Sequence, residues 1–151
     1  MFDRLLSLLN GPAAERRVPD EALSVALLLL ELARADYEFP EVERQRIVEL
    51  LAQRYNLDNA RTEALLQQAQ AAGSEAVSLY DYVQALNARY GPEGKLELME
   101  LLWEVAYADG RLDANEEHLL RKLAGLLYVP DSDFIRTKLR VAERREKAGG
   151  A

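Results

Sequence analysis

The chain has 151 residues, with 19 bases, 26 acids and 49% hydrophobic residues, which is sufficient for one domain around a single core. Leu and Ala together supply 50 residues, whereas Val, Ile and Thr supply only 13, so the composition favours an all-α fold. The chain has no cysteine and one histidine, which excludes disulfides, thiolate chemistry, His-rich metal centres and His-dependent catalytic triads.

Helical periodicity, interrupted by Gly, Pro, Asn and Asp, predicts a single-domain bundle of seven to eight helices. We expect a short helix and connector over residues 1–17, a helical domain over residues 18–147, and a frayed tail over residues 148–151. The predicted helices cover residues 2–9, 19–35, 40–55, 59–72, 79–89, 94–108, 114–128 and 133–147. The second of these is the most apolar, so we expect it at the centre of the bundle.

The pattern of charge and hydropathy limits the kinds of partner. No apolar run is longer than the six residues Val25–Leu30, far short of the roughly 20 that cross a bilayer, and the start of the chain lacks a secretory pattern. We therefore expect a cytoplasmic protein without a transmembrane segment. Residues 1–135 carry 13 bases and 24 acids, which disfavours nucleic acid. Residues 136–147 carry six bases and two acids, so peripheral membrane association could run only through this segment.

The sequence contains an internal repeat. At a shift of 73 residues, Leu23–Asp58 lies over Leu96–Asp131 with 11 identities in 36 positions. Seven identities fit packing positions, Tyr55/Tyr128 among them, and four are acidic: Glu31/Glu104, Asp36/Asp109, Glu43/Glu116 and Asp58/Asp131. The repeat predicts two helical hairpins related by pseudo-twofold symmetry, over about residues 20–58 and 93–131.

Asp36 and Asp109 are the most informative of these acids. Each follows the C-terminus of a predicted helix, where the negative end of the helix dipole disfavours a carboxylate. Hydrogen bonds from free N–H groups at the start of the next helix would compensate this cost. A bound cation would do so as well, since Asp109, Asp113 and Glu116 lie within eight residues that span a turn.

The first unit helps to choose between these two explanations. In the second unit, Asp113 and Glu116 fit a capping box, which needs no metal. In the first unit Pro40 stands where Asp113 stands in the second, yet Glu43 is retained. A metal site explains this retention, whereas helix-start chemistry remains the alternative. We predict a Ca²⁺, Mg²⁺ or Mn²⁺ site whose ligands are Asp36, Glu43, Asp109, Asp113 and Glu116.

Glu31 and Glu104 are less easily placed. Each glutamate lies five residues before the aspartate of its unit. On a regular helix, this spacing separates the two side chains by about 140° around the axis. They are candidates for carboxylates that support the metal ligands, or for partners in contacts between helices. An EF-hand is rejected because Arg111, Ala114 and Leu120 occupy loop positions that need an oxygen ligand, a glycine and a bidentate glutamate.

Three segments of the second unit carry a family resemblance. The chain resembles the TerB-like family of tellurite-resistance proteins in residues 106–116, AYADGRLDANE, in residues 119–123, LLRKL, and in residues 128–130, YVP. The resemblance implies a helical bundle of two related hairpins whose acidic residues bind a divalent metal. It also implies a role in tellurite resistance or a broader bacterial stress response. The first unit departs from the signature at Tyr37 and Pro40, so its half-site is expected to be weaker or structural.

These observations predict a non-enzymatic metal-binding module that acts on a protein partner, with no catalytic residues. The alternative is a metal-independent interaction scaffold, with a homodimer as one form, in which the acids only cap helices. No base or substrate-binding pattern supports a metal-dependent hydrolase.

Overall fold

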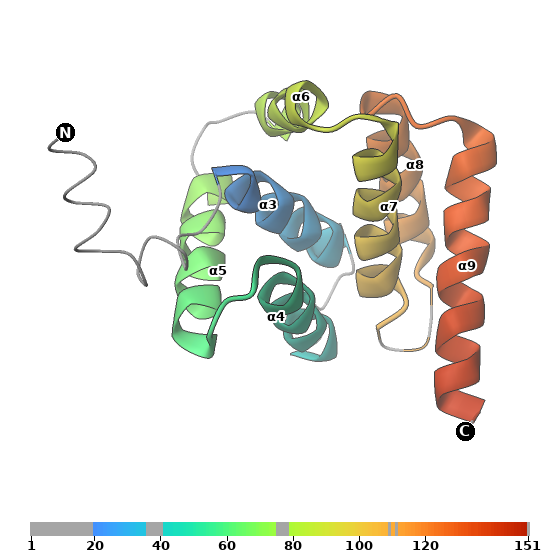
Figure 1. Ribbon diagram of the computed structural model, residues 1–151, viewed down its shortest axis with the longest axis horizontal. Helices are drawn as coiled ribbons and strands as arrows, with labels where there is room; N and C mark the ends of the chain where they lie inside the picture. Colours follow the sequence, from blue (N-terminus) through green and yellow to red (C-terminus); the bar gives the residue numbers. More distant parts are fainter. Residues whose placement is uncertain (1–19, 36–40, 75–78, 109, 111, 151) are drawn as a thin grey trace, which may run out of the picture.

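The computed structural model describes residues 20–35, 41–74, 79–108, 110 and 112–150, and this part of the chain forms seven α-helices (Figure 1). They are α3 (Asp20–Ala35), α4 (Glu41–Tyr55), α5 (Asn59–Ser74), α6 (Leu79–Arg89), α7 (Pro92–Ala106), α8 (Ala114–Leu126) and α9 (Asp131–Gly150). The predicted all-α fold is confirmed. The helix expected at residues 2–9 and its connector lie outside the described residues. Within the described ranges, no helix combines the length and apolar character that a bilayer crossing needs.

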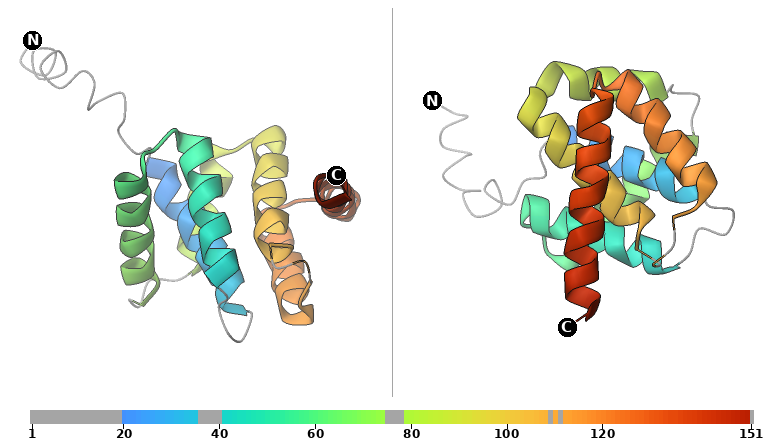
Figure 2. Two further views of the ribbon diagram at one scale, coloured as in Figure 1. Left: turned by 90° about the horizontal axis from the view of Figure 1, so that it is seen from below. Right: turned by 90° about the vertical axis from the view of Figure 1, so that its right-hand side faces the viewer.

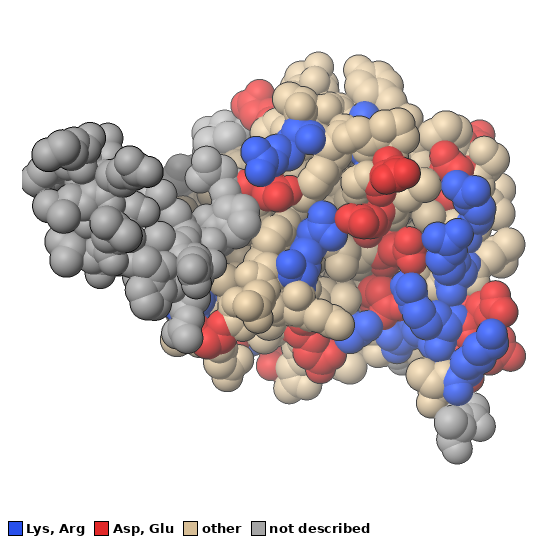
Figure 3. Space-filling view, in the orientation of Figure 1, with Lys and Arg blue, Asp and Glu red and all other residues tan. Residues whose placement is uncertain are grey.

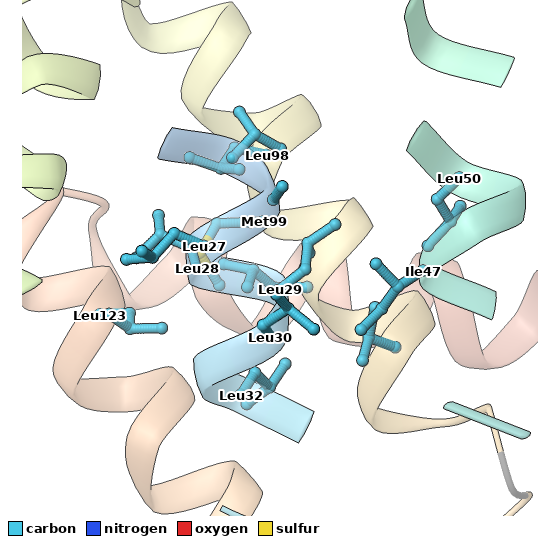
Figure 4. Packing of buried hydrophobic residues seen from close by; sticks show 14 of the residues in the cluster. Leu27, Leu28, Leu29, Leu30, Leu32, Ile47, Leu50, Leu98, Met99 and Leu123 are labelled. Atoms are coloured by element: carbon cyan, nitrogen blue, oxygen red, sulfur yellow. The ribbon is translucent and has the colours of Figure 1, made fainter. Parts of the chain in front are cut away.

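Helix α3 is the centre of the bundle, as its composition predicts. It contacts α4, α5, α6, α7 and α8, and Figure 1 shows these helices arranged around it. Every residue from Val25 to Leu30 is almost completely buried. In Figure 4 the four leucines of this run lie among Ile47 of α4, Leu98 of α7 and Leu123 of α8. A fully buried leucine contributes about 2 kcal/mol, so this one helix supplies a large share of the hydrophobic stabilisation.

Several helix ends differ from the predicted ones. Helix α7 begins two residues early because Pro92 suits its first turn, and it ends two residues early at Ala106. Gly110 adopts φ +83°, which favours glycine, and its N–H donates to the carbonyl of Tyr107 at 2.8 Å. Helix α9 begins at Asp131, two residues before the predicted start, and extends to Gly150, three residues beyond the predicted end.

Tyr128 does not pack as the repeat predicts. Its side chain is 72% exposed, although its counterpart Tyr55 packs against the core. The difference arises at the end of α8, where Tyr128 adopts φ +59° just beyond the last helical turn. The buried Leu127 and Val129 on either side cover the core in its place, and Lys95 lies over the tyrosine ring at 5.4 Å.

The repeat is longer in the structure than in the sequence. With the shift of 73 residues, α4 and α8 begin at equivalent positions, and α3 and α7 begin within one residue of equivalence. The same shift brings the start of α5 within one residue of the start of α9, so each unit contains three helices. Helix α5 packs on α3 and α4, whereas α9 packs chiefly on α7 along the outer side of the bundle (Figure 2).

Trp103 joins α9 to α7. The ring is fully buried, and its centroid lies 4.9 Å from that of Phe134. The indole N–H donates to the hydroxyl of Thr137 at 3.1 Å. Trp103 stands opposite Leu30 in the repeat, so the larger ring of the second unit fills the space at the α7–α9 seam.

Candidate metal site

Glu43 and Glu116 occupy equivalent and completely buried positions. Each is the third residue of its helix, α4 or α8, and each has an exposed fraction of 0%. Burial of a carboxylate is costly unless hydrogen-bond donors or opposite charge compensate it. The first turn of a helix offers both N–H groups and the positive end of the dipole. The same residue type, position and burial therefore recur in both units.

Asp113 caps helix α8. Its backbone is extended, with φ −72° and ψ 137°, and its side chain accepts a hydrogen bond from the N–H of Asn115 at 2.6 Å. The predicted capping role is confirmed. Metal binding by the same carboxylate stays a prediction.

The full five-residue ligand set is only partly placed. Asp36 and Asp109 lie outside the described residues; in the sequence they come before α4 and α8. Within the ranges that the structure covers, no three His, Cys, Asp or Glu residues gather as a metal-binding group. The structure thus places Glu43, Asp113 and Glu116 at two helix starts. Their convergence with the two aspartates stays a prediction.

Glu104 is a partner in contacts between helices, one of the two roles expected for it. Its side chain is 7% exposed and pairs with Arg46 of α4. Two arginines of α9 also approach it, Arg144 at 3.5 Å and Arg145 at 3.6 Å. Its counterpart Glu31 instead pairs with Arg34 of its own helix at 3.2 Å and is partly exposed. The two units therefore differ at this position.

The arginines around Glu104 were not predicted. Burial alone lowers the pKa of Arg46, but hydrogen bonds to Glu104 and Glu49 raise that pKa above its ordinary value, so the guanidinium stays charged. The sequence offered two signals. Arg46 stands where the second unit has Leu119, and the bases of residues 136–147 occur in a helix whose neighbours are acidic.

The described helices define an all-helical module built from a repeated unit, with a buried glutamate at the start of the second helix of each unit. A family model described as "Tellurite resistance protein TerB" matches residues 22–139. The chain belongs to the TerB family, which confirms the resemblance found in its sequence. No curated protein and no solved structure matches the chain significantly.

Proposed function

We propose that this chain is a non-enzymatic module of the TerB family that binds a hard divalent cation of the Ca²⁺, Mg²⁺ or Mn²⁺ class. The observation that carries the proposal is the matched, complete burial of Glu43 and Glu116. A buried glutamate recurs at the third position of both helices, which supports a shared role, and carboxylate oxygens are ligands that hard divalent ions prefer. The proposed ligands are Asp36, Glu43, Asp109, Asp113 and Glu116.

The donor set suits this class of ion. Carboxylate oxygens are hard ligands, and a loop that leads into a helix can add main-chain carbonyl oxygens. Each loop lies between the two helices of a hairpin, α3–α4 or α7–α8. A bound ion would hold the ends of these hairpins and so fix the surface presented to a protein partner. The cellular role that family membership suggests is tellurite resistance or a bacterial stress response in the cytoplasm.

A metal-independent interaction scaffold is the second candidate. The capping bond from Asp113 favours it, because this carboxylate already has a structural role. Asp58 does the same for α5 by accepting the N–H of Arg61 at 2.8 Å. In this alternative the acids of the repeat cap the starts of helices. Replacing one capping carboxylate by an amide then lowers the free energy of unfolding by about 1 kcal/mol or less.

Thermal unfolding of chelator-stripped protein, with Ca²⁺, Mg²⁺, Mn²⁺ or Zn²⁺ added, separates the two candidates. A ligand that binds only the folded state raises the midpoint in a saturable way. We expect this rise with a hard ion, and its loss in Asp36→Asn and Asp109→Asn with helix content retained. Asp58→Asn, a repeat aspartate outside the proposed ligand set, is the matched control and should respond like wild type. A flat response up to millimolar ion would support the scaffold.

A further inference from the structure

A groove lies between α4 and α9, across the C-terminal end of α7. Its volume is about 550 Å³, within the range of ligand-binding clefts. The residues that line it include Val42 and Arg46 from α4, Glu104 from α7, and Arg144, Arg145 and Ala148 from α9. It therefore brings together charged and apolar side chains from three helices.

The lining of the groove is positive within an acidic chain. Three arginines and two glutamates line it, whereas the whole chain has a net charge of −7. Glu104 is almost fully buried and pairs with all three arginines, whereas the exposed Glu49 pairs with Arg46 at 2.9 Å, so the lining keeps an excess of one positive charge. Arg46, Arg144 and Arg145 keep exposed fractions of 30%, 53% and 30%. Figure 3 shows basic side chains gathered along α9 on this face.

The apolar part of the lining restricts the ligand further. Val42 is 44% exposed and is one of the few large apolar side chains at the surface of the described chain. Ala108 and Ala148 add small apolar surfaces beside it. A ligand that matches the whole groove has carboxylates for the guanidinium groups and an apolar side chain next to them. Guanidinium groups bind carboxylates through two parallel hydrogen bonds, which gives such a contact direction as well as energy.

We propose that this groove binds a short acidic segment of a partner protein, in which one or two carboxylates flank an apolar side chain. The segment must be short, because the acidic surface outside the groove repels a long polyanion such as nucleic acid. The proposal concerns residues other than the proposed metal ligands. Its test therefore gives an answer whether or not the chain binds metal.

The test is the fluorescence anisotropy of a labelled peptide, Leu-Glu-Glu-Leu-Glu, titrated with the full chain. A second peptide with Gln in place of each Glu is the ligand control. We expect saturable binding of the first peptide, weakened by rising salt, and binding of the second that is at least about tenfold weaker. Absence of saturable binding of the acidic peptide would overturn the proposal.

Two matched pairs of variants locate the binding. Val42→Glu and Ile135→Glu each add one acid at a site exposed by 44% and 48%, but only Val42 lines the groove. Arg144→Gln and Arg136→Gln each remove one ion-paired base of α9, exposed by 53% and 56%, but only Arg144 lines the groove. The groove variants should weaken binding about tenfold and the controls less than about twofold.

The same variants can contradict the proposal. Equal weakening by the groove variants and their controls would show that binding follows net charge and not this groove. Stronger competition by a single-stranded oligonucleotide than by unlabelled acidic peptide would replace the protein segment with nucleic acid. Circular dichroism of each variant verifies that helix content is retained. Val42→Glu keeps the test valid if Arg144→Gln perturbs the α7–α9 contact.

Discussion

Glu104 shows how one side chain can hold three helices together. It lies on α7 and pairs with Arg46 of α4 and with Arg144 and Arg145 of α9. Glu104→Gln removes the charge that these bases share while it keeps the size of the side chain. We expect a loss of about 2 kcal/mol in the free energy of unfolding, measured by urea denaturation, because hydrogen bonds to charged groups are the stronger ones.

Glu49→Gln is the control for this prediction. Glu49 pairs with the same Arg46 at 2.9 Å but is 63% exposed, so solvent screens the interaction. We expect a loss below about 0.5 kcal/mol. Equal losses in the two variants would contradict the view that burial makes the Glu104 cluster important.

At the residue scale, the sequence predicted the acids better than their partners. Glu43 and Glu116 stood out because the repeat aligns them, and both are buried. The contact of Glu104 with Arg46 joins residues 58 positions apart, and its contact with Arg144 joins residues 40 positions apart. No local period connects such pairs, since they depend on how α4, α7 and α9 pack. The sequence indicated that Glu104 has a role, but it did not show which side chains pair with it.

At the scale of elements, the seam between α7 and α9 depends on a hydroxyl group. Thr137 accepts the indole N–H of Trp103 and donates to a carbonyl of its own helix. Thr137→Val leaves that buried N–H without its acceptor. We expect a loss of about 1–3 kcal/mol in the free energy of unfolding and a change in tryptophan emission. Urea denaturation followed by fluorescence measures both.

Thr62→Val provides the matched comparison. Thr62 is also buried, and its hydroxyl likewise donates to the carbonyl four residues before it, that of Asp58, at 2.8 Å. The Thr62 hydroxyl has no hydrogen bond to the indole. Thr62→Val should therefore lower the free energy of unfolding by less than Thr137→Val and leave the tryptophan emission unchanged. A greater loss for Thr62→Val would show that the bond inside the helix matters more than the seam.

The hydrogen bonds around Arg54 of α4 predict that the free energy of unfolding depends on pH. Arg54 donates to the hydroxyl groups of Tyr55 and Tyr90, at 3.3 and 3.2 Å. Burial is the largest cause of the raised pKa of both tyrosines. The folded state keeps these phenols protonated at a pH where the unfolded chain ionises them. The contribution of the two tyrosines to the free energy of unfolding is complete below the unfolded pKa of about 10, and it decreases as pH rises above that value.

This dependence is measured by the free energy of unfolding between neutral pH and pH values above about 10. The double variant Tyr55→Phe, Tyr90→Phe should show a shallower decrease than wild type. Tyr128→Phe is the control, and it should follow wild type because its ring is 72% exposed. An unchanged slope in the double variant would contradict the assigned cause.

The sequence predicted the order of the helices and the central position of α3, but not how the other helices pack. Apolar periodicity located α3 and its central position, and Asp113 correctly marked the start of α8. The third helix of each unit was not recognised as part of the repeat, because α5 and α9 share few residues at the shift of 73. Their different contacts explain this divergence, since α5 packs on two helices of its unit and α9 chiefly on one.

At the scale of the whole molecule, both units contribute to the proposed metal site. Asp36 and Asp109 come before α4 and α8 in the sequence, Asp113 caps α8, and Glu43 and Glu116 lie in the first turns of α4 and α8. Helix α9 adds two of the three arginines of the groove. Arg145 also donates to the carbonyl of Ala108 at 3.3 Å, so α9 contacts the chain just before the second loop. In the proposed account, metal binding positions the two hairpins, and the groove supplies a separate surface for a partner.

The most direct test of the proposed metal site is a calorimetric titration of chelator-stripped protein with Ca²⁺, Mg²⁺ and Mn²⁺. We predict saturable heat from at least one of these ions in the wild type. Glu43→Gln and Glu116→Gln should each weaken this binding, because both buried carboxylates belong to the ligand set. Asp58→Asn should bind like wild type. No saturable heat with any ion, or equal binding in wild type and both glutamate variants, would contradict the metal site and leave these acids as helix-start chemistry.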